Sequence, residues 1–239
     1  MKILITGATS GIGRQLALDY NADGHEVIAI GRNEEALAEL DLLGMTSHQI
    51  DLTDRAQALD FFATLTVVDL AILNAGTCEY VDLPEFDSAM VARVMRANVE
   101  SMAISIEGVL PLLRQSSAPH LVGVGSSAAY LPLPRAEAYG ASKAAVAYLI
   151  DTLRVDLARE NIAVSLVSPG FVRTPLTDRN DFPMPMRIEV EEASRRIRKG
   201  IAERKKEIHF PKRFTLVMKL FGLLPRGLWL PIAKRMVKK

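Results

Sequence analysis

The sequence has very few residues that could form disulfides or bind metals. Cys78 is the only cysteine among 239 residues, so no internal disulfide can form. A single cysteine suits a reducing compartment, and we expect a cytoplasmic protein. The four histidines stand far apart, without the short spacings of metal ligands, and we predict no metal site. They are His25, His48, His120 and His209.

The sequence has no evident linker or repeat, and we expect no targeting segment. No Pro/Ser-rich linker, low-complexity tract or internal repeat divides the chain, so we expect a single domain over residues 1–239. A predicted strand begins at Lys2, which leaves no room for a secretory signal before it. The formal net charge is only +1, so the overall charge does not suggest a nucleic-acid partner.

Short apolar runs alternate with segments of helical pattern along most of the chain. Strands separated by helices form parallel βαβ units, and continuous apolar strands are typical of sheets covered on both faces. The pattern therefore predicts an α/β fold with a doubly wound parallel sheet. We expect strands at residues 2–5, 26–30, 45–50, 67–73, 121–126 and 162–167, with helices at 14–23, 33–42, 53–64, 84–116 and 139–160.

Tyr139 and Lys143 are the most informative pair of residues. Four positions apart on a helix, their side chains stand on the same face. An ammonium group beside a phenol favours the phenolate, so we expect Lys143 to lower the pKa of Tyr139 and make it a proton donor and acceptor. Tyr and Lys at this spacing also occur on many solvated helices, so the pair needs support from other residues.

A glycine-rich turn follows the first predicted strand. The segment Thr6-Gly7-Ala8-Thr9-Ser10-Gly11-Ile12-Gly13 lies between that strand and a predicted helix. Glycines let the backbone approach a pyrophosphate, and the N-terminal N–H groups of the helix point toward it. The turn indicates a dinucleotide site, although a turn that merely requires glycine is the simpler alternative.

Together these segments resemble the short-chain dehydrogenase/reductase family, over nearly the whole chain. The resemblance includes Asn74-Ala75-Gly76 after the fourth strand, Asp51-Leu52 after the third, Asn98, and Pro169-Gly170-Phe171-Val172-x-Thr174. One departure is Ser101, which stands where the family commonly has glycine. The resemblance implies an NAD(P)-dependent Rossmann-type oxidoreductase with Asn98, Ser126, Tyr139 and Lys143 as catalytic residues. The implied cofactor site consists of Gly7, Ser10, Gly11, Ile12, Gly13, Arg32, Asp51, Leu52, Asn74, Ala75, Gly76, Tyr139, Lys143, Pro169, Gly170, Val172 and Thr174.

Ser126 is preferred to its neighbour Ser127 as the catalytic serine. It stands thirteen residues before Tyr139, as the family resemblance requires, and it ends a predicted strand. Ser127 is then expected to supply a helix-cap or loop hydroxyl. The resemblance implies that Ser126 stabilises the substrate oxygen, that Tyr139 transfers a proton, that Lys143 also binds the nicotinamide ribose, and that Asn98 holds a water for proton relay.

The end of the second strand favours NADP over NAD. An NAD site commonly has an acidic residue there, which accepts hydrogen bonds from the ribose 2′-hydroxyl. This chain has Gly31, followed by Arg32, whose guanidinium can pair with a 2′-phosphate. Arg32 could instead be a solvated loop residue that stacks on adenine without strong preference.

The C-terminal region is strongly basic. From Arg195 to Lys239 there are fifteen Lys/Arg against two acidic residues, a local net charge of +13, whereas the preceding residues carry −12. We expect residues 205–239 to form a basic amphipathic helical extension. Its apolar runs are too short to span a bilayer, which leaves three alternatives: packing over the substrate cleft, peripheral membrane contact, or binding of an anionic substrate or acidic partner.

The substrate is the least determined part of the prediction. Residues after Thr174, with Leu176, Phe182, Met184 and Met186 among them, suggest an apolar lid over a ketone, aldehyde or alcohol. The family resemblance implies a homodimer or homotetramer with contacts at residues 98–115 and 139–159. A non-catalytic NADP(H) sensor is the alternative function, which the completeness of the catalytic set makes less favoured.

Overall fold

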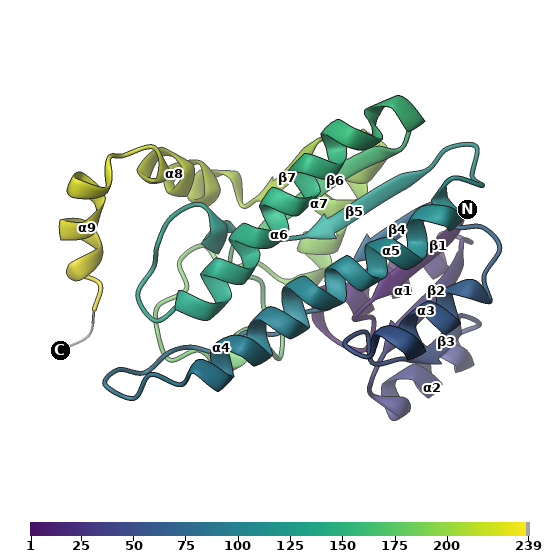
Figure 1. Cartoon of the computed structure of the whole chain (residues 1–239), viewed down its shortest axis with the longest axis horizontal. Helices are drawn as coiled ribbons and strands as arrows, with labels where there is room; N and C mark the ends of the chain where they lie inside the picture. Colours follow the sequence, from purple (N-terminus) through teal and green to yellow (C-terminus); the bar gives the residue numbers. More distant parts are fainter. Residues whose placement is uncertain (238–239) are drawn as a thin grey trace.

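A seven-stranded parallel sheet forms the centre of the computed structural model, which describes residues 1–237 (Figure 1). The strand order is β3-β2-β1-β4-β5-β6-β7, so the chain reverses direction across the sheet between β1 and β4. In open α/β sheets such a switch point is where ligands bind. The strands are β1 (Lys2–Thr6), β2 (Glu26–Gly31), β3 (Thr46–Gln49), β4 (Leu70–Leu73), β5 (His120–Val124), β6 (Ala163–Pro169) and β7 (Glu207–Phe210).

Helices cover both faces of this sheet, which confirms the predicted doubly wound α/β fold. Helices α1, α2 and α7 pack on one face, and α3, α5 and α6 pack on the other. The helices are α1 (Gly11–Ala22), α2 (Glu34–Leu42), α3 (Arg55–Ala63), α4 (Ser88–Met95), α5 (Ser101–Leu113), α6 (Glu137–Asp156), α7 (Val190–Ala202), α8 (Lys212–Gly222) and α9 (Arg226–Lys234). A π-helical turn (Arg96–Glu100) joins α4 to α5, and short 3₁₀ turns lie at Ser127–Ala129, Leu157–Glu160 and Thr177–Arg179.

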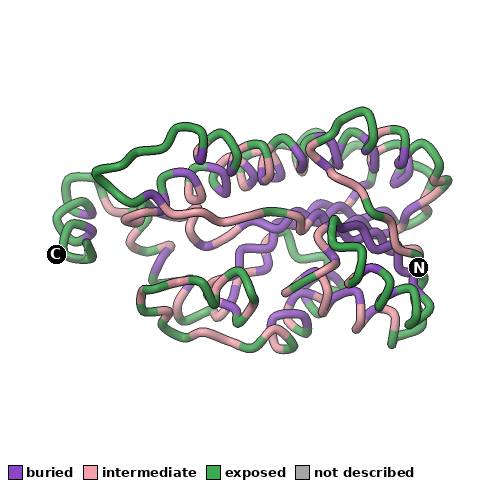
Figure 2. The backbone as a smooth tube through the Cα atoms, turned by 90° about the horizontal axis from the view of Figure 1, so that it is seen from below, coloured by how far each residue is buried: buried purple, intermediate pink, exposed green. Residues whose placement is uncertain are grey.

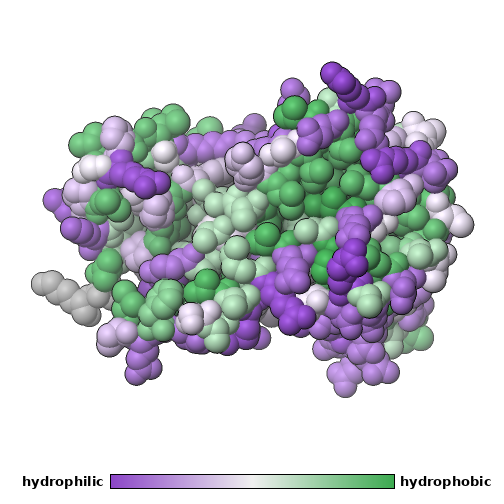
Figure 3. All heavy atoms as spheres, in the orientation of Figure 1, coloured by the Kyte–Doolittle hydropathy of each residue, from purple (hydrophilic) through white to green (hydrophobic). Residues whose placement is uncertain are grey.

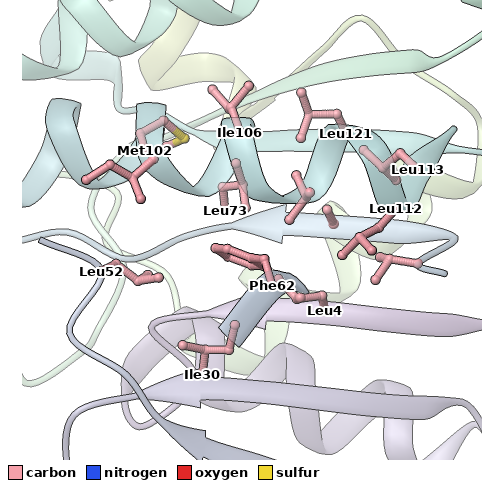
Figure 4. Close-up of a cluster of buried hydrophobic side chains, with 14 of the residues drawn as sticks. Leu4, Ile30, Leu52, Phe62, Leu73, Met102, Ile106, Leu112, Leu113 and Leu121 are labelled. Carbon is pink, nitrogen blue, oxygen red and sulfur yellow. The ribbon is translucent and has the colours of Figure 1, made fainter. Parts of the chain in front are cut away.

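The apolar runs form strands because both faces of each strand are buried. Ile3 and Ile5 of β1 point into the layer of α1 and α7, whereas Leu4 between them points into the layer of α3 and α5. Figure 4 shows the second layer, where Phe62 of α3 lies between the sheet and α5. Burial on both faces stabilises the parallel strands side by side. Their carboxyl ends therefore lie at the same edge of the sheet, where the glycine turn also lies.

The C-terminal part differs from the prediction in two ways. Residues 205–239 were expected to be helical, but Glu207–Phe210 forms β7, an edge strand paired with β6. Its buried residues, Ile208 and Phe210, alternate with partly exposed ones, as in a half-covered strand. The helix α7 was not predicted either. Residues 238 and 239 lie outside the described residues.

The last two helices form the end of the molecule opposite the N-terminus (Figure 1). They pack through Met218, Trp229 and Ala233 against the loop that follows β5, where Leu131 is buried. The Trp229 indole donates a hydrogen bond to the Pro132 carbonyl at 2.9 Å. Figure 2 shows that most of this end is nevertheless exposed. No helix of residues 1–237 is long and apolar enough to cross a membrane.

Candidate active site

The turn after β1 brings the backbone close to a cleft at the switch point. Gly7 has φ +66° and Gly11 has φ +52°, conformations that favour glycine. A methyl group on Gly13 would lie 2.2 Å from the Gly7 carbonyl oxygen, so the turn and α1 pack too closely for a side chain. Gly7, Ser10, Gly11 and Ile12 line a cleft of about 440 Å³, whereas Gly13 lies behind the turn.

One end of this cleft is formed by the ends of β2 and β3. Gly31, Arg32, Asp51 and Leu52 line it together. A side chain on Gly31 would begin 2.3 Å from a methyl group of Thr9, so any larger residue here requires the Thr9 side chain to move. Asp51 lies two residues beyond the end of β3, because this strand ends one residue earlier than predicted.

Asp51 is held in place by its own loop. Its carboxylate accepts hydrogen bonds from the Thr53 amide at 2.9 Å and the Thr53 hydroxyl at 2.8 Å. The backbone hydrogen bond lowers the pKa of Asp51, and the nearby Arg32 charge acts in the same direction. Asp51 is therefore an ionised acceptor at neutral pH.

Asn74 ties the ends of β1 and β4 together. Its amide nitrogen donates to the carbonyls of Thr6 and Gly7, both at 3.2 Å. In return, the Thr6 hydroxyl accepts from the backbone amides of Asn74 at 2.9 Å and Ala75 at 3.1 Å. Asn74, Ala75 and Gly76 line the same cleft, as the motif predicts.

Ser126 and Tyr139 meet in an adjoining pocket of about 120 Å³. A hydrogen bond joins their side chains. Ser127 is buried and does not line this pocket. The capping function expected of Ser127 belongs instead to Ser126, whose hydroxyl accepts from the Ala128 amide at 3.1 Å.

Lys143 is buried one turn along α6 from Tyr139. Its ammonium donates to the Val124 carbonyl at 2.9 Å and lies 5.9 Å from the centre of the Tyr139 ring. This spacing brings the two side chains together as predicted, and both line the pocket.

The direction of the Tyr139 pKa shift differs from the prediction. Burial raises the pKa of Tyr139 to about 12, the Cys78 charge acts in the same direction, and the hydrogen bond from Ser126 opposes both. Burial also lowers the pKa of Lys143 to about 8. Desolvation is the largest cause of both shifts, and the charge of Lys143 is not among the causes that shift the pKa of Tyr139. Tyr139 is consequently protonated at neutral pH.

Asn98 lies in the π-helical turn between α4 and α5, a kind of turn often found at functional sites. Its side chain is fully buried and bonded within the protein. The amide nitrogen donates to the Thr77 carbonyl and the Ser142 hydroxyl, both at 2.9 Å, and the oxygen accepts from the Thr77 amide at 2.6 Å. Both amide hydrogens are thus used, so only the oxygen could hold the expected water.

The segment after β6 closes the other side of the pocket. Pro169, Gly170, Val172 and Thr174 all line it. Thr174 faces the glycine turn, because a methyl group on Gly11 would lie 3.1 Å from the Thr174 methyl carbon. The structure thus brings together the predicted cofactor residues, with Gly13 supporting them from behind.

Several residues at the site were not predicted. Thr9, Asn33, Thr77 and Arg179 also line the cleft. Cys78 was considered only for disulfides, yet its thiolate form would raise the pKa of both Tyr139 and Lys143, although burial raises the pKa of the thiol itself. The sequence could have pointed to Cys78 at the site, because it stands only two residues after Gly76 of the predicted cofactor motif.

Aromatic contacts cluster around the loop that follows β6. Phe182 of the loop after β6 contacts Tyr80 and Phe171, with ring centres 5.2 and 6.1 Å apart. Phe171 in turn contacts Phe214 of α8 at 5.5 Å. Arg135 forms ion pairs with Asp82 and with Asp181 in the same loop. Among residues 1–237, no group of three or more His, Cys, Asp or Glu could hold a metal ion.

Comparison with known proteins gives consistent matches. The model of the short chain dehydrogenase family matches residues 1–182. An uncharacterised oxidoreductase of Myxococcus xanthus is 34% identical over 98% of this chain and 96% of its own length. An NADP-dependent 3-hydroxy acid dehydrogenase of Shigella flexneri is 32% identical over 72% of this chain and 73% of its own. The crystal structure of a short-chain dehydrogenase/reductase from Burkholderia phymatum in complex with NAD has a TM-score of 0.84 and 25% identity, covering 100% of this chain and 96% of that one.

Proposed function

The chain belongs to the short-chain dehydrogenase/reductase family of NAD(P)-dependent oxidoreductases, which act on CH–OH groups, and on this premise we propose that it reduces an apolar ketone or aldehyde with NADPH. The observation that carries the proposal is the meeting of Ser126 and Tyr139 in one pocket with the segment that begins at Pro169. The glycine turn fits a dinucleotide, because its backbone lines the cleft without side chains. When bound, the dinucleotide supplies the hydride.

In this proposal Tyr139 is the general acid. Its raised pKa keeps the hydroxyl protonated at neutral pH, so a proton is available for a substrate oxygen. Ser126 donates a hydrogen bond to the same oxygen and stabilises the negative charge that develops there. Lys143 supplies the nearby positive charge and Asn98 supports the turn beside it. Reduction is the direction that a protonated tyrosine favours, and alcohol oxidation is the reverse.

The test is oxidation of NADPH against ketones and aldehydes graded in size and apolarity. Tyr139→Phe is expected to lower kcat/KM by roughly 10²–10⁴-fold. Tyr148→Phe is the matched control, because Tyr148 is on the same helix with 77% of its surface exposed, and it should retain activity. Tight NADPH binding without turnover across the whole panel would contradict the proposal and favour a cofactor sensor.

The preference for NADP rests on the ends of β2 and β3. Gly31 provides no carboxylate for the ribose of NAD, and Arg32 is exposed at the cleft, without an ion pair in the described part of the chain. The Shigella flexneri relative is NADP-dependent, which supports the same preference. Arg32→Gln should weaken NADPH binding roughly 10–100-fold and leave NADH binding within about twofold, measured by titration calorimetry. Equal losses for both cofactors would contradict a 2′-phosphate contact.

An apolar substrate is proposed from the aromatic loop around Phe182. Its ring contacts Tyr80 and Phe171, and it belongs to the same loop whose earlier residues Leu176 and Thr177 line the pocket. Rates should rise with the apolar length of the ketone, and Phe182→Ser should abolish that trend. A preference for small polar carbonyls would contradict this part of the proposal.

We expect a homodimer or homotetramer through α5 and α6. Figure 3 shows apolar side chains gathered over these two helices, and Tyr148 and Val155 are exposed on α6. Such a face is typical of a subunit contact. Light scattering should give a multiple of 26.2 kDa. Val155→Glu should shift the protein toward monomer, and a strictly monomeric wild type would contradict the contact.

The basic C-terminal extension is proposed to make peripheral contact with a membrane, on the cytoplasmic side that the single cysteine favours. Lys219 is the one cation of α8 that is paired inside the protein, with Glu207.

A further inference from the structure

The helix α8 is apolar on both of its sides. Its inner side packs against the protein through Thr215 and Met218, which are buried. Its outer side carries Leu216, Leu220 and Leu223 at helical spacing, and Leu220 and Leu223 are 63% and 82% exposed. Packing on the core therefore explains only half of the apolar residues of this helix.

The helix α9 repeats the same arrangement. Trp229 and Ala233 face inward and are buried. Leu228, Leu230 and Ile232 are exposed, and so are Met236 and Val237 beyond the end of the helix. We call the exposed apolar residues of the two helices, together with those that follow α9, the outer face. The simpler alternative is an amphipathic helix pair in which only lysines face water. The exposed apolar residues of α8 and α9 do not agree with that alternative.

Cations surround the outer face. Residues 211–237 contain six Lys/Arg and no Asp/Glu. Five of the six are exposed and form no ion pair within the described residues: Lys212, Arg213, Arg226, Lys234 and Arg235. In Figure 3 the end of the molecule that α8 and α9 form carries apolar and hydrophilic side chains side by side.

We propose that the outer face docks on an anionic lipid bilayer. Exposed aliphatic side chains ringed by cations match the boundary between acyl chains and acidic headgroups. A second copy of the chain fits poorly, because it would bring two clusters of unpaired cations together. The helices are too short to span the bilayer, so the contact is interfacial.

The helix α8 also packs against the segment that lines the candidate pocket, because Phe214 lies beside Gly170. Phe214, on the inner side of α8, contacts Phe171, and Phe171 contacts Phe182 of the substrate loop. A docked molecule therefore holds the pocket close to the bilayer, where an apolar carbonyl compound concentrates. This last consequence rests on the proposed reductase function, whereas the docking itself does not.

The experiment is co-sedimentation of the full chain with vesicles. One set is phosphatidylcholine alone, and the other contains about 30 mol% phosphatidylserine. We expect binding to the anionic vesicles that is much weaker at about 0.5 M than at about 0.05 M NaCl, because salt screens the cations. Tyr139→Phe should bind equally well, which separates docking from turnover.

Paired substitutions on the outer face test each component. Leu220→Ser with Leu223→Ser should weaken binding at least about tenfold. Arg226→Gln with Lys234→Gln should weaken it roughly 30-fold. Leu42→Ser with Leu43→Ser is the matched control on α2, where Leu42 is 88% exposed, and it should not change binding.

Three results would overturn the proposal. The first is absence of binding to either set of vesicles, and the second is equal binding to neutral and anionic vesicles. The third is retention on immobilised polyglutamate without vesicle binding, which would assign the outer face to an acidic protein partner.

Discussion

A methyl group at position 13 tests how the cofactor turn is held together. In Gly13→Ala the new methyl carbon would lie 2.2 Å from the Gly7 carbonyl oxygen and 2.5 Å from the Asn74 amide nitrogen. Ordinary contacts are about 3.5–4.0 Å, so either group must move by about 1 Å or more. The turn has little free space around Gly7, since even a methyl group there would lie 2.8 Å from the Ala75 Cα.

The expected cost combines three effects. Overpacking costs about 1–3 kcal/mol, and the two hydrogen bonds from Asn74 to Thr6 and Gly7 contribute about 1 kcal/mol each when lost. Alanine in place of glycine in a helix stabilises by about 1 kcal/mol. The net loss is about 2–4 kcal/mol in the free energy of unfolding. Because the displaced carbonyl belongs to the cofactor turn, NADPH should also bind at least about tenfold more weakly.

Urea unfolding followed by ellipticity measures the first quantity, and NADPH titration measures the second. Gly140→Ala on α6 is the matched control, since its methyl group would meet no atom closer than 3.5 Å. It should be as stable as the wild type or more stable by up to about 1 kcal/mol. Wild-type stability and wild-type NADPH affinity in Gly13→Ala would refute the close-packing explanation.

Three further predictions concern other parts of the molecule. Burial lowers the pKa of His120 to about 4. The unfolded chain therefore binds a proton on this residue more tightly than the folded chain does. The free energy of unfolding should fall by up to about 3 kcal/mol as the pH drops from about 6.5 to 4. His120→Gln should remove most of this slope in urea midpoints, and an unchanged slope would contradict it. Trp229 is the only tryptophan, so its fluorescence should report release of α9 at a lower urea concentration than the loss of ellipticity; coincident transitions would count against local release. Arg135 forms ion pairs with Asp82 and Asp181, which lie in two different loops. Arg135→Ala should therefore raise KM by about 3–10-fold with little effect on kcat. A fall in kcat alone would contradict a role of Arg135 in holding these loops.

Most of the sheet could be predicted from apolar runs, but its last strand could not. Strands buried on both faces, such as β1 and β5, are continuous apolar segments that stand out from their surroundings. β7 is a four-residue edge strand in which Glu207 and His209 alternate with buried residues, and so short a pattern is ambiguous. The helix α7 could have been predicted from the sequence, since Ala193, Ile197 and Ile201 repeat at helical spacing.

The candidate site was predictable as a set of residues, but its electrostatics were not. The spacing of Tyr139 and Lys143 determines that they meet, whereas the depth of burial determines their pKa values. Burial depends on how α6 packs against β5, which no local motif encodes. The same limit applies to Asn98, because a π-helical turn has no evident sequence pattern, and its hydrogen bonds to Thr77 and Ser142 depend on that turn.

The position of α8 and α9 makes the molecule an electric dipole. Residues 211–239 carry eight positive charges and no negative ones, and since the whole chain has a net charge of +1, the first 210 residues carry −7. The positive pole lies at the end opposite the N-terminus, toward which the carboxyl ends of the strands also point (Figure 1). Its field attracts the phosphates of the dinucleotide toward that end before any contact forms. Encounter with the cofactor should therefore be fast at low ionic strength and slow progressively as salt is added.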